Sequence, residues 1–157
     1  MTKWINLTAP AAVVVMSVSS AAHAVQYLTI PEAQKHAFPS ATNFTEVQAG
    51  RIWKAEAGGR LVGFFIFDRV IGKHLFIDYA VALDPAGRVH EVEILQYRES
   101  YGGEVRSPSW LAQFVGKNSA STLQMGNDIR NISGATLSSQ HVTDGVKRIL
   151  AIAPRLR

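Results

Sequence analysis

The run SGATLSS, residues 133–139, combines four hydroxyl side chains with almost no side-chain bulk. It lies directly before a stretch with helical periodicity. The N-terminus of a helix offers unpaired N–H groups and a partial positive charge, which favour a phosphate. Gly134 and Ala135 would let the backbone approach a ligand closely. We therefore interpret the run as a candidate phosphate-binding segment. A capped helix preceded by a tight turn is the alternative, and it explains the same residues equally well.

The stretch that follows predicts the helix that would position this run. Apolar side chains recur at i, i+4, i+7 and i+8, the spacing of one helical face: Val142, Val146, Ile149 and Leu150. Serine is a preferred N-cap residue, so we expect Ser138 or Ser139 to cap the helix.

A central sheet is predicted from three stretches rich in Val, Phe and Ile, which cover residues 60–72, 74–84 and 88–97. The turns between them are short, which favours an antiparallel meander. Residues 45–53 indicate further extended chain.

Short helices are expected beside this sheet. One covers residues 32–38 and ends at Pro39, and another lies within WLAQFVGK, residues 110–117. The sequence therefore predicts an α+β fold, a single domain with an antiparallel sheet flanked by helices.

Residues 1–24 have the pattern of a secretory signal peptide. Lys3 precedes an apolar stretch from Ala9 to Val18, and Ala22-His23-Ala24 fits a cleavage site. We expect cleavage after Ala24 and a periplasmic location, with residues 25–157 forming one domain. An uncleaved anchor helix is the alternative, but the apolar stretch is short for a membrane span.

The composition excludes several kinds of site. The chain has no cysteine, which rules out disulfides, thiolate metal sites and iron–sulfur clusters, so redox chemistry would need an organic cofactor or a histidine-bound metal. The net charge is +4 and the basic residues are scattered, which argues against nucleic-acid binding. No two histidines have the i, i+4 spacing of a helical metal site, and His74 with His90 is only a weak pair across strands. We predict no metal.

SGAT followed by LSS resembles the flavinylation motif of the FMN-binding domain family. This family includes the C subunit of the sodium-pumping quinone reductase and the G subunit of the Rnf complex. The motif threonine there carries FMN through a phosphoester bond, which an FAD:protein FMN transferase makes outside the cytoplasm. The matching residue is Thr136. The resemblance implies that its neighbours also bind the cofactor: Ser133, Gly134, Ala135, Leu137 and Ser138.

The resemblance extends over about residues 72–146, through the strand–turn–strand FIDYAVALDPAGRVHEVEILQYRES and the segment WLAQFVGK. Residues 99–102 hold the place of the family's Glu-Thr-Pro-Gly-like loop. The implied cofactor-binding residues in these segments are Glu99, Tyr101, Gly102 and Trp110.

The chain departs from the family pattern at three positions. Arg130 replaces a frequent aspartate three positions before the motif serine, Tyr101 replaces a proline, and Glu104 replaces a glycine. Whether Arg130 prevents covalent attachment stays open at this point.

Several residues have both a functional and an ordinary structural interpretation. Trp110, Phe114 and Tyr97 would pack against the flavin ring or belong to the core. Lys117 would neutralise the phosphate or end a helix in solvent, and His141 would contact the flavin or be exposed.

Three functions follow from these observations. The first is an exported electron carrier with FMN on Thr136, whose partners are the transferase and a membrane or periplasmic reductase. Thr136 would not react unaided, because a threonine hydroxyl needs a base or a metal to become a nucleophile. The second is a non-redox periplasmic module that binds a phosphate-bearing ligand. The third, a flavin-dependent reductase in its own right, is disfavoured because we find no acid, base and nucleophile together.

Overall fold

The computed structural model describes residues 24–157. The predicted signal peptide lies outside these residues except for Ala24, so its cleavage stays a prediction. Within the described part, no helix combines the length and the apolar character needed to cross a membrane.

Six antiparallel strands form one sheet in the order β1-β6-β5-β4-β3-β2. Neighbouring strands from β2 to β6 are consecutive in the sequence, which confirms the predicted meander and extends it to five strands. The first strand, β1, is short and pairs with β6, and the sequence did not indicate this pairing. The strands are β1 (Val25–Gln26), β2 (Asn43–Gln48), β3 (Ile52–Ala57), β4 (Arg60–Ile71), β5 (Phe76–Leu83) and β6 (Val89–Tyr97).

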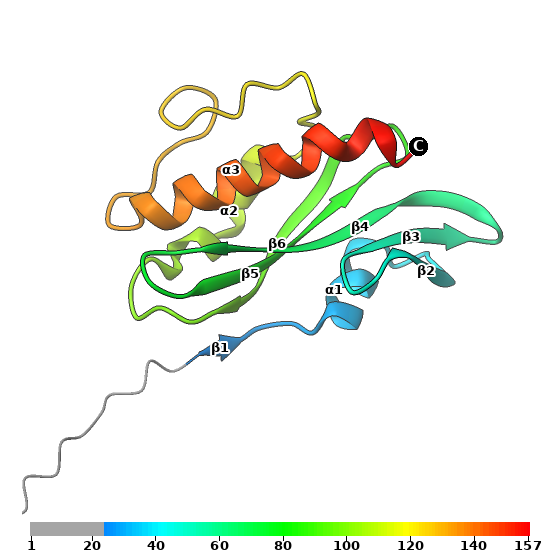
Figure 1. Ribbon diagram of the computed structural model, residues 1–157, viewed down its shortest axis with the longest axis horizontal. Helices are drawn as coiled ribbons and strands as arrows, with labels where there is room; N and C mark the ends of the chain where they lie inside the picture. The colour runs from blue at the N-terminus through cyan, green and yellow to red at the C-terminus, as the bar shows by residue number, and fades with distance from the viewer. Residues whose placement is uncertain (1–23) are drawn as a thin grey trace, which may run out of the picture.

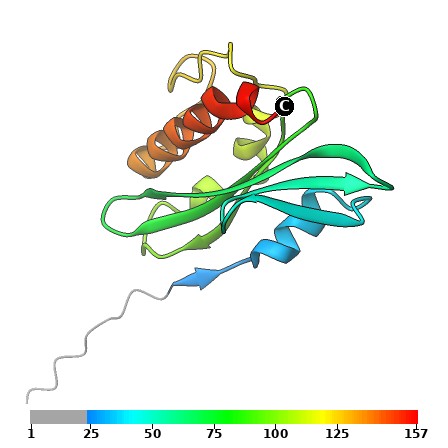
Figure 2. The ribbon, with the colours of Figure 1, turned by 45° about the vertical axis from the view of Figure 1, so that its right-hand side comes forward.

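Helices cover both faces of the sheet (Figures 1 and 2). The long helix α3 (Thr136–Ile152) lies across one face, and α1 (Ile30–Ala37) lies against the other. Shorter helical elements lie between β6 and α3: the 3₁₀ turn η1 (Gly103–Arg106), the helix α2 (Pro108–Leu111) and the 3₁₀ turn η2 (Ala112–Phe114). A further 3₁₀ turn, η3 (Ala153–Arg155), follows α3. This arrangement confirms the predicted single α+β domain.

Two apolar cores hold the layers together, one on each face of the sheet. The larger core packs α3 against the sheet, and it buries the predicted apolar face of this helix with Tyr79 and Phe114. The smaller core packs α1 against the other face around Phe38 and Phe65. Burial of apolar surface of this kind is the main force that fixes the position of each helix.

The start of α3 differs from the predicted one. The helix begins at Thr136, and its N-cap Ala135 provides no side-chain hydrogen bond. Ser138 and Ser139 lie inside the first turns, so the prediction that one of them is the cap is wrong. The hydroxyl of Ser139 donates instead to the carbonyl oxygen of Ala135, at 2.9 Å. A serine inside a helix can donate its hydroxyl to the carbonyl oxygen of residue i−4. Serines near a helix start can therefore lie either at the N-cap or inside the helix, and the sequence alone does not decide which.

Candidate functional site

A groove of about 700 Å³ lies at the N-terminal end of α3, and we call it the α3 groove. Three segments that are distant in the sequence form it. They are the turn between β4 and β5 (residues 73–75), the chain after β6 (residues 99–102) and the start of α3 (residues 134–138). The β4–β5 turn follows closely on β4, and β4 packs against α3. The structure thus brings together most of the predicted cofactor-binding residues: Gly134, Ala135, Thr136, Leu137, Ser138, Glu99, Tyr101 and Gly102.

Glu99 holds two of these segments together. Its carboxylate accepts hydrogen bonds from the backbone N–H groups of His74 and Leu75, the latter at 3.0 Å. Burial disfavours the charged form, but the N–H groups of the turn outweigh it and lower the pKa of Glu99 below its ordinary value. Glu99 is therefore ionised at neutral pH and fixes the turn that forms one wall of the α3 groove.

The buried hydroxyl of Tyr97 joins the chain after β6 to the start of α3. It donates to the carbonyl oxygen of Tyr101 and lies 3.1 Å from the Ser138 hydroxyl. Burial is the main cause that raises the pKa of Tyr97, which keeps the phenol protonated. Tyr97 and Ser138 therefore align the chain after β6 with the first turn of α3.

Gly102 is required where these segments meet. Its φ is +88°, and a Cβ atom there would lie 2.5 Å from the Tyr97 hydroxyl oxygen and 3.0 Å from the Ser138 Oγ. Glycine alone avoids both the left-handed strain and these overlaps. This close approach gives Gly102 a structural role, and its predicted contact with a cofactor stays a prediction.

Thr136 places an exposed hydroxyl in the α3 groove, at the first position of α3. The side-chain amide of Asn131 donates to its Oγ1 at 3.3 Å. Asn131 is itself held by Ser139, whose single hydroxyl proton is shared between the Oδ1 of Asn131, at 3.1 Å, and the backbone carbonyl oxygens of the α3 N-terminus. A chain of two hydrogen bonds thus orients the hydroxyl of Thr136 while leaving it accessible. Asn131 was missed at the sequence level because an asparagine in a polar loop carries no pattern.

The rim of the α3 groove is apolar on one part and basic on another. Leu75, Tyr101 and Leu137 expose 39%, 87% and 49% of their surfaces, so three large apolar side chains face solvent around one groove. Lys73 and His74 contribute basic groups from the β4–β5 turn. Lys73 falls between the two predicted strands and carries no pattern, and the sequence indicates His74 only as a weak metal-binding pair with His90.

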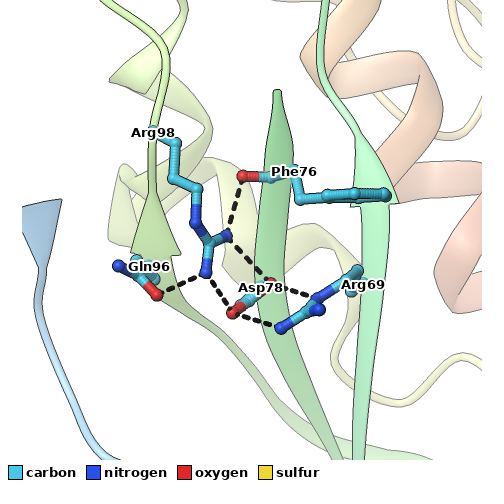
Figure 3. Close-up of polar contacts among 5 residues, drawn as sticks. All are labelled: Arg69, Phe76, Asp78, Gln96 and Arg98. Carbon is cyan, nitrogen blue, oxygen red and sulfur yellow. Dashed lines mark hydrogen bonds and ion pairs between the residues drawn. The ribbon is translucent and has the colours of Figure 1, made fainter. Parts of the chain in front are cut away.

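An ion-pair network braces the strands from which the walls emerge (Figure 3). Asp78 of β5 accepts hydrogen bonds from Arg69 of β4 at 2.8 Å and from Arg98 after β6 at 2.7 Å. The carboxylate is buried, which by itself raises its pKa, but the two guanidinium groups outweigh this and leave the pKa of Asp78 below its ordinary value. Arg98 also donates to the carbonyl oxygen of Phe76 at 3.0 Å. The network fixes the ends of β4, β5 and β6 beside one another.

Trp110 and Ser133 lie outside the α3 groove. They line a separate cavity of about 710 Å³ together with Arg130. Trp110 is buried against Phe114 in an edge-to-face pair, and its Nε1 donates to the carbonyl oxygen of Arg130 at 2.7 Å. The structure thus gives Trp110 a core position, and its predicted contact with a cofactor stays a prediction.

Lys117 and His141 have partners within the protein. The Lys117 ammonium donates to Asp128 at 3.1 Å, and this carboxylate also accepts the backbone N–H groups of Leu123 and Gln124. The Nδ1 of His141 lies 2.6 Å from the carbonyl oxygen of Ile71, so that nitrogen carries the proton. Lys117 therefore fixes the loop before α3, and His141 fixes α3 to the end of β4.

Comparison with known proteins identifies the family. The model of the FMN-binding domain matches residues 72–151, just over half of the chain. Six chains of solved structures match, among them the crystal structure of Shewanella oneidensis NqrC. That match has a TM-score of 0.51 at 15% sequence identity and covers 79% of this chain and 75% of the other, so it shows a shared fold. The search of curated proteins finds no match. The matched region contains all three segments of the α3 groove, and the chain belongs to the FMN-binding domain family.

Proposed function

We propose that the protein is an exported electron carrier whose FMN is attached to Thr136 by a phosphoester bond. The observation that carries the proposal is the position of Thr136. It is the exposed hydroxyl at the N-terminus of α3, inside the α3 groove and within the region that matches the family.

The residues of the α3 groove fit the two halves of FMN. The first turn of α3 and the basic Lys73 and His74 suit a phosphate, since backbone N–H groups and positive charge both favour an anion. The apolar rim of Leu75, Tyr101 and Leu137 suits a flat aromatic ring. A groove of about 700 Å³ is within the range of cofactor sites, roughly 300–1,000 Å³.

Attachment is a phosphoryl transfer with FAD as the donor. The Oγ1 of Thr136 forms a bond to the phosphorus nearer the flavin, the bond from this phosphorus to the AMP oxygen breaks, and AMP leaves. The hydroxyl proton passes to a base of the transferase. The hydrogen bond from Asn131 to Oγ1 holds the hydroxyl oxygen toward solvent, where an external enzyme can reach it. Among the described residues, no carboxylate or histidine forms a hydrogen bond with Oγ1, which fits a reaction that needs the transferase.

The bound flavin would supply one- and two-electron chemistry. The protein contributes the tether, the orientation and the environment. Thr136 keeps the cofactor from diffusing away, and the braced walls of the α3 groove fix where the ring can lie. We propose a membrane or periplasmic reductase as the redox partner and the periplasm as the location, in keeping with the predicted signal peptide.

The proposal is tested by co-expression with the transferase in a periplasm, followed by denaturing electrophoresis and in-gel flavin fluorescence. We expect a fluorescent band for the wild type and none for Thr136→Ala. Thr143→Ala is the matched control, because Thr143 is buried in α3 away from the groove, and its band should fluoresce.

The redox part has its own readout. Dithionite should bleach the flavin absorbance of the purified protein, and a soluble acceptor should restore it. A colourless wild-type protein obtained in the presence of active transferase would overturn the proposal and favour a module that binds another phosphate-bearing ligand.

A further inference from the structure

A cluster of three potential metal ligands lies on the face of the sheet that α1 covers. Glu91 and Glu93 are two residues apart on β6, so their side chains point to the same face. His36 of α1 lies over them, with its Nδ1 at 3.2 Å from Glu91 Oε1 and in hydrogen-bonding contact with Glu93 Oε1. One ligand atom from each residue lies within 4.8 Å of the other two.

Within the described residues, His36 is the only basic group paired with the two carboxylates of this cluster. The side chains of Glu91 and Glu93 are only 28% and 16% exposed, yet among residues 24–157 no Lys or Arg forms an ion pair with either. The buried Asp78, by contrast, has two arginines.

Two basic side chains close to the cluster in the groove or in the sequence are engaged elsewhere. Arg106 lines the neighbouring groove, but its guanidinium stacks on the ring of Tyr27 at 3.9 Å. The ammonium of Lys35 donates to the carbonyl oxygen of Pro39 at 3.0 Å. Two carboxylates therefore face one imidazole, and partly buried charges of one sign call for a counter-ion.

From these observations we propose that His36, Glu91 and Glu93 bind a divalent first-row transition-metal ion. Imidazole nitrogen with carboxylate oxygen suits Zn²⁺ and its neighbours, whereas Mg²⁺ and Ca²⁺ prefer oxygen alone. Zinc bonds of about 2.0–2.1 Å in a tetrahedral site place the ligand atoms roughly 3.4 Å apart. The three ligand atoms already lie within 4.8 Å of one another, near this spacing.

The site has room for an exogenous ligand. Its residues line a groove of about 470 Å³ between α1, β6 and α2, which apolar side chains such as Leu28, Leu111 and Val115 complete. Three protein ligands leave the fourth position of a tetrahedral ion for water or for a molecule in this groove. The site lies on the face of the sheet opposite α3, so it is independent of the proposed flavin attachment.

The test is calorimetric titration of the untagged, EDTA-treated protein with Zn²⁺, and with Mg²⁺ as a comparison. We expect one Zn²⁺ per chain and no competition from Mg²⁺. Glu93→Gln and His36→Ala should each weaken binding by more than about 100-fold, since even the loss of an outer-shell partner costs roughly 10–100-fold. Glu93→Gln preserves the side-chain shape and keeps a hydrogen bond to His36 available, so it separates ligand loss from misfolding.

Two controls remove a histidine and a carboxylate from other surfaces. His74→Ala and Glu46→Gln should bind Zn²⁺ as the wild type does, because both residues are exposed and lie outside the cluster. Zn²⁺ should also raise the melting temperature of the wild type but not that of Glu93→Gln. No binding by the wild type, or binding that survives both cluster variants, would overturn the proposal.

Discussion

At the scale of single residues, Asn131 is the side chain that donates a hydrogen bond to the hydroxyl of Thr136, the proposed attachment point. Its amide donates to Thr136 Oγ1 and accepts from Ser139, so it has one partner on each side. Removing it frees the Thr136 side chain to rotate without removing the nucleophile. Covalent attachment should therefore become slower without being abolished.

For Asn131→Ala we expect flavinylation to slow by about 2- to 10-fold, equivalent to the roughly 0.5–1.5 kcal/mol of a typical hydrogen bond. The measurement is the time course of in-gel flavin fluorescence with purified transferase and FAD. Asn127→Ala is the control, since Asn127 is an exposed asparagine of the same loop outside the α3 groove. Equal rates for both variants would show that Asn131 does not orient Thr136.

Gly102 is the second residue whose change has a defined consequence. In Gly102→Ala the new Cβ overlaps the Tyr97 hydroxyl, and the left-handed backbone adds strain. We expect the free energy of unfolding to fall by about 2–4 kcal/mol, measured by urea denaturation.

Gly126→Ala isolates the backbone part of this loss. Gly126 has φ +78° but no atom within 4 Å of a Cβ there, so only about 1–2 kcal/mol should be lost. Equal losses in the two variants would mean that the contact of Gly102 with Tyr97 contributes nothing.

At the scale of elements, Asp128 organises the loop that leads into α3. Backbone N–H groups, chiefly that of Gln124, and the Lys117 ammonium lower its pKa to about 2, from an ordinary value of 3.8. A carboxyl whose pKa is lower in the folded state contributes stability above the unfolded-state pKa and loses it as the pH falls toward 2. The free energy of unfolding should therefore decline between about pH 4 and pH 2 partly through Asp128.

The variant Asp128→Asn should be less stable than the wild type at pH 7 and should lose less stability on acidification. Chemical denaturation at several pH values measures both effects. Asp144→Asn, on α3 and outside the loop, controls for the removal of one carboxylate. A wild-type slope in Asp128→Asn between pH 4 and pH 2 would contradict this role.

The regular elements were predictable from the sequence, because their signals are local. The apolar spacing at Val142, Val146 and Ile149 predicted α3, and all three side chains are buried. The strands β4 to β6 followed from β-branched and aromatic runs. The two-residue β1 was not predictable, since a pair of residues carries no pattern and pairs with β6 only through the tertiary fold.

At the scale of the whole molecule, the candidate sites depend on contacts between distant segments. The family motif pointed to Thr136, but the neighbouring Lys73 and Asn131 come from loops without any signature. His36 and Glu93 are 57 positions apart, and rules of spacing along one helix cannot find such a pair. The prediction of no metal rested on those rules. The cluster of His36, Glu91 and Glu93 is the reason to test that prediction by measuring Zn²⁺ binding.

Both faces of the sheet thus carry a candidate site. The α3 face holds the groove around Thr136, and the α1 face holds the cluster around Glu93. Because the two sites share no residue, loss of one should leave the other intact. A Glu93→Gln variant should therefore still be flavinylated at Thr136, as in-gel fluorescence would show, and loss of its fluorescent band would reveal a coupling between the faces.

The central claim is that Thr136 carries FMN, and intact mass spectrometry of the protein purified from a periplasm with active transferase tests it most directly. We predict an added mass equal to FMN less one water, located on Thr136 by fragmentation and missing in Thr136→Ala. Such a result would also show that Arg130 does not prevent attachment. An unmodified wild-type mass, obtained beside a known substrate that the same transferase does modify, would contradict the account.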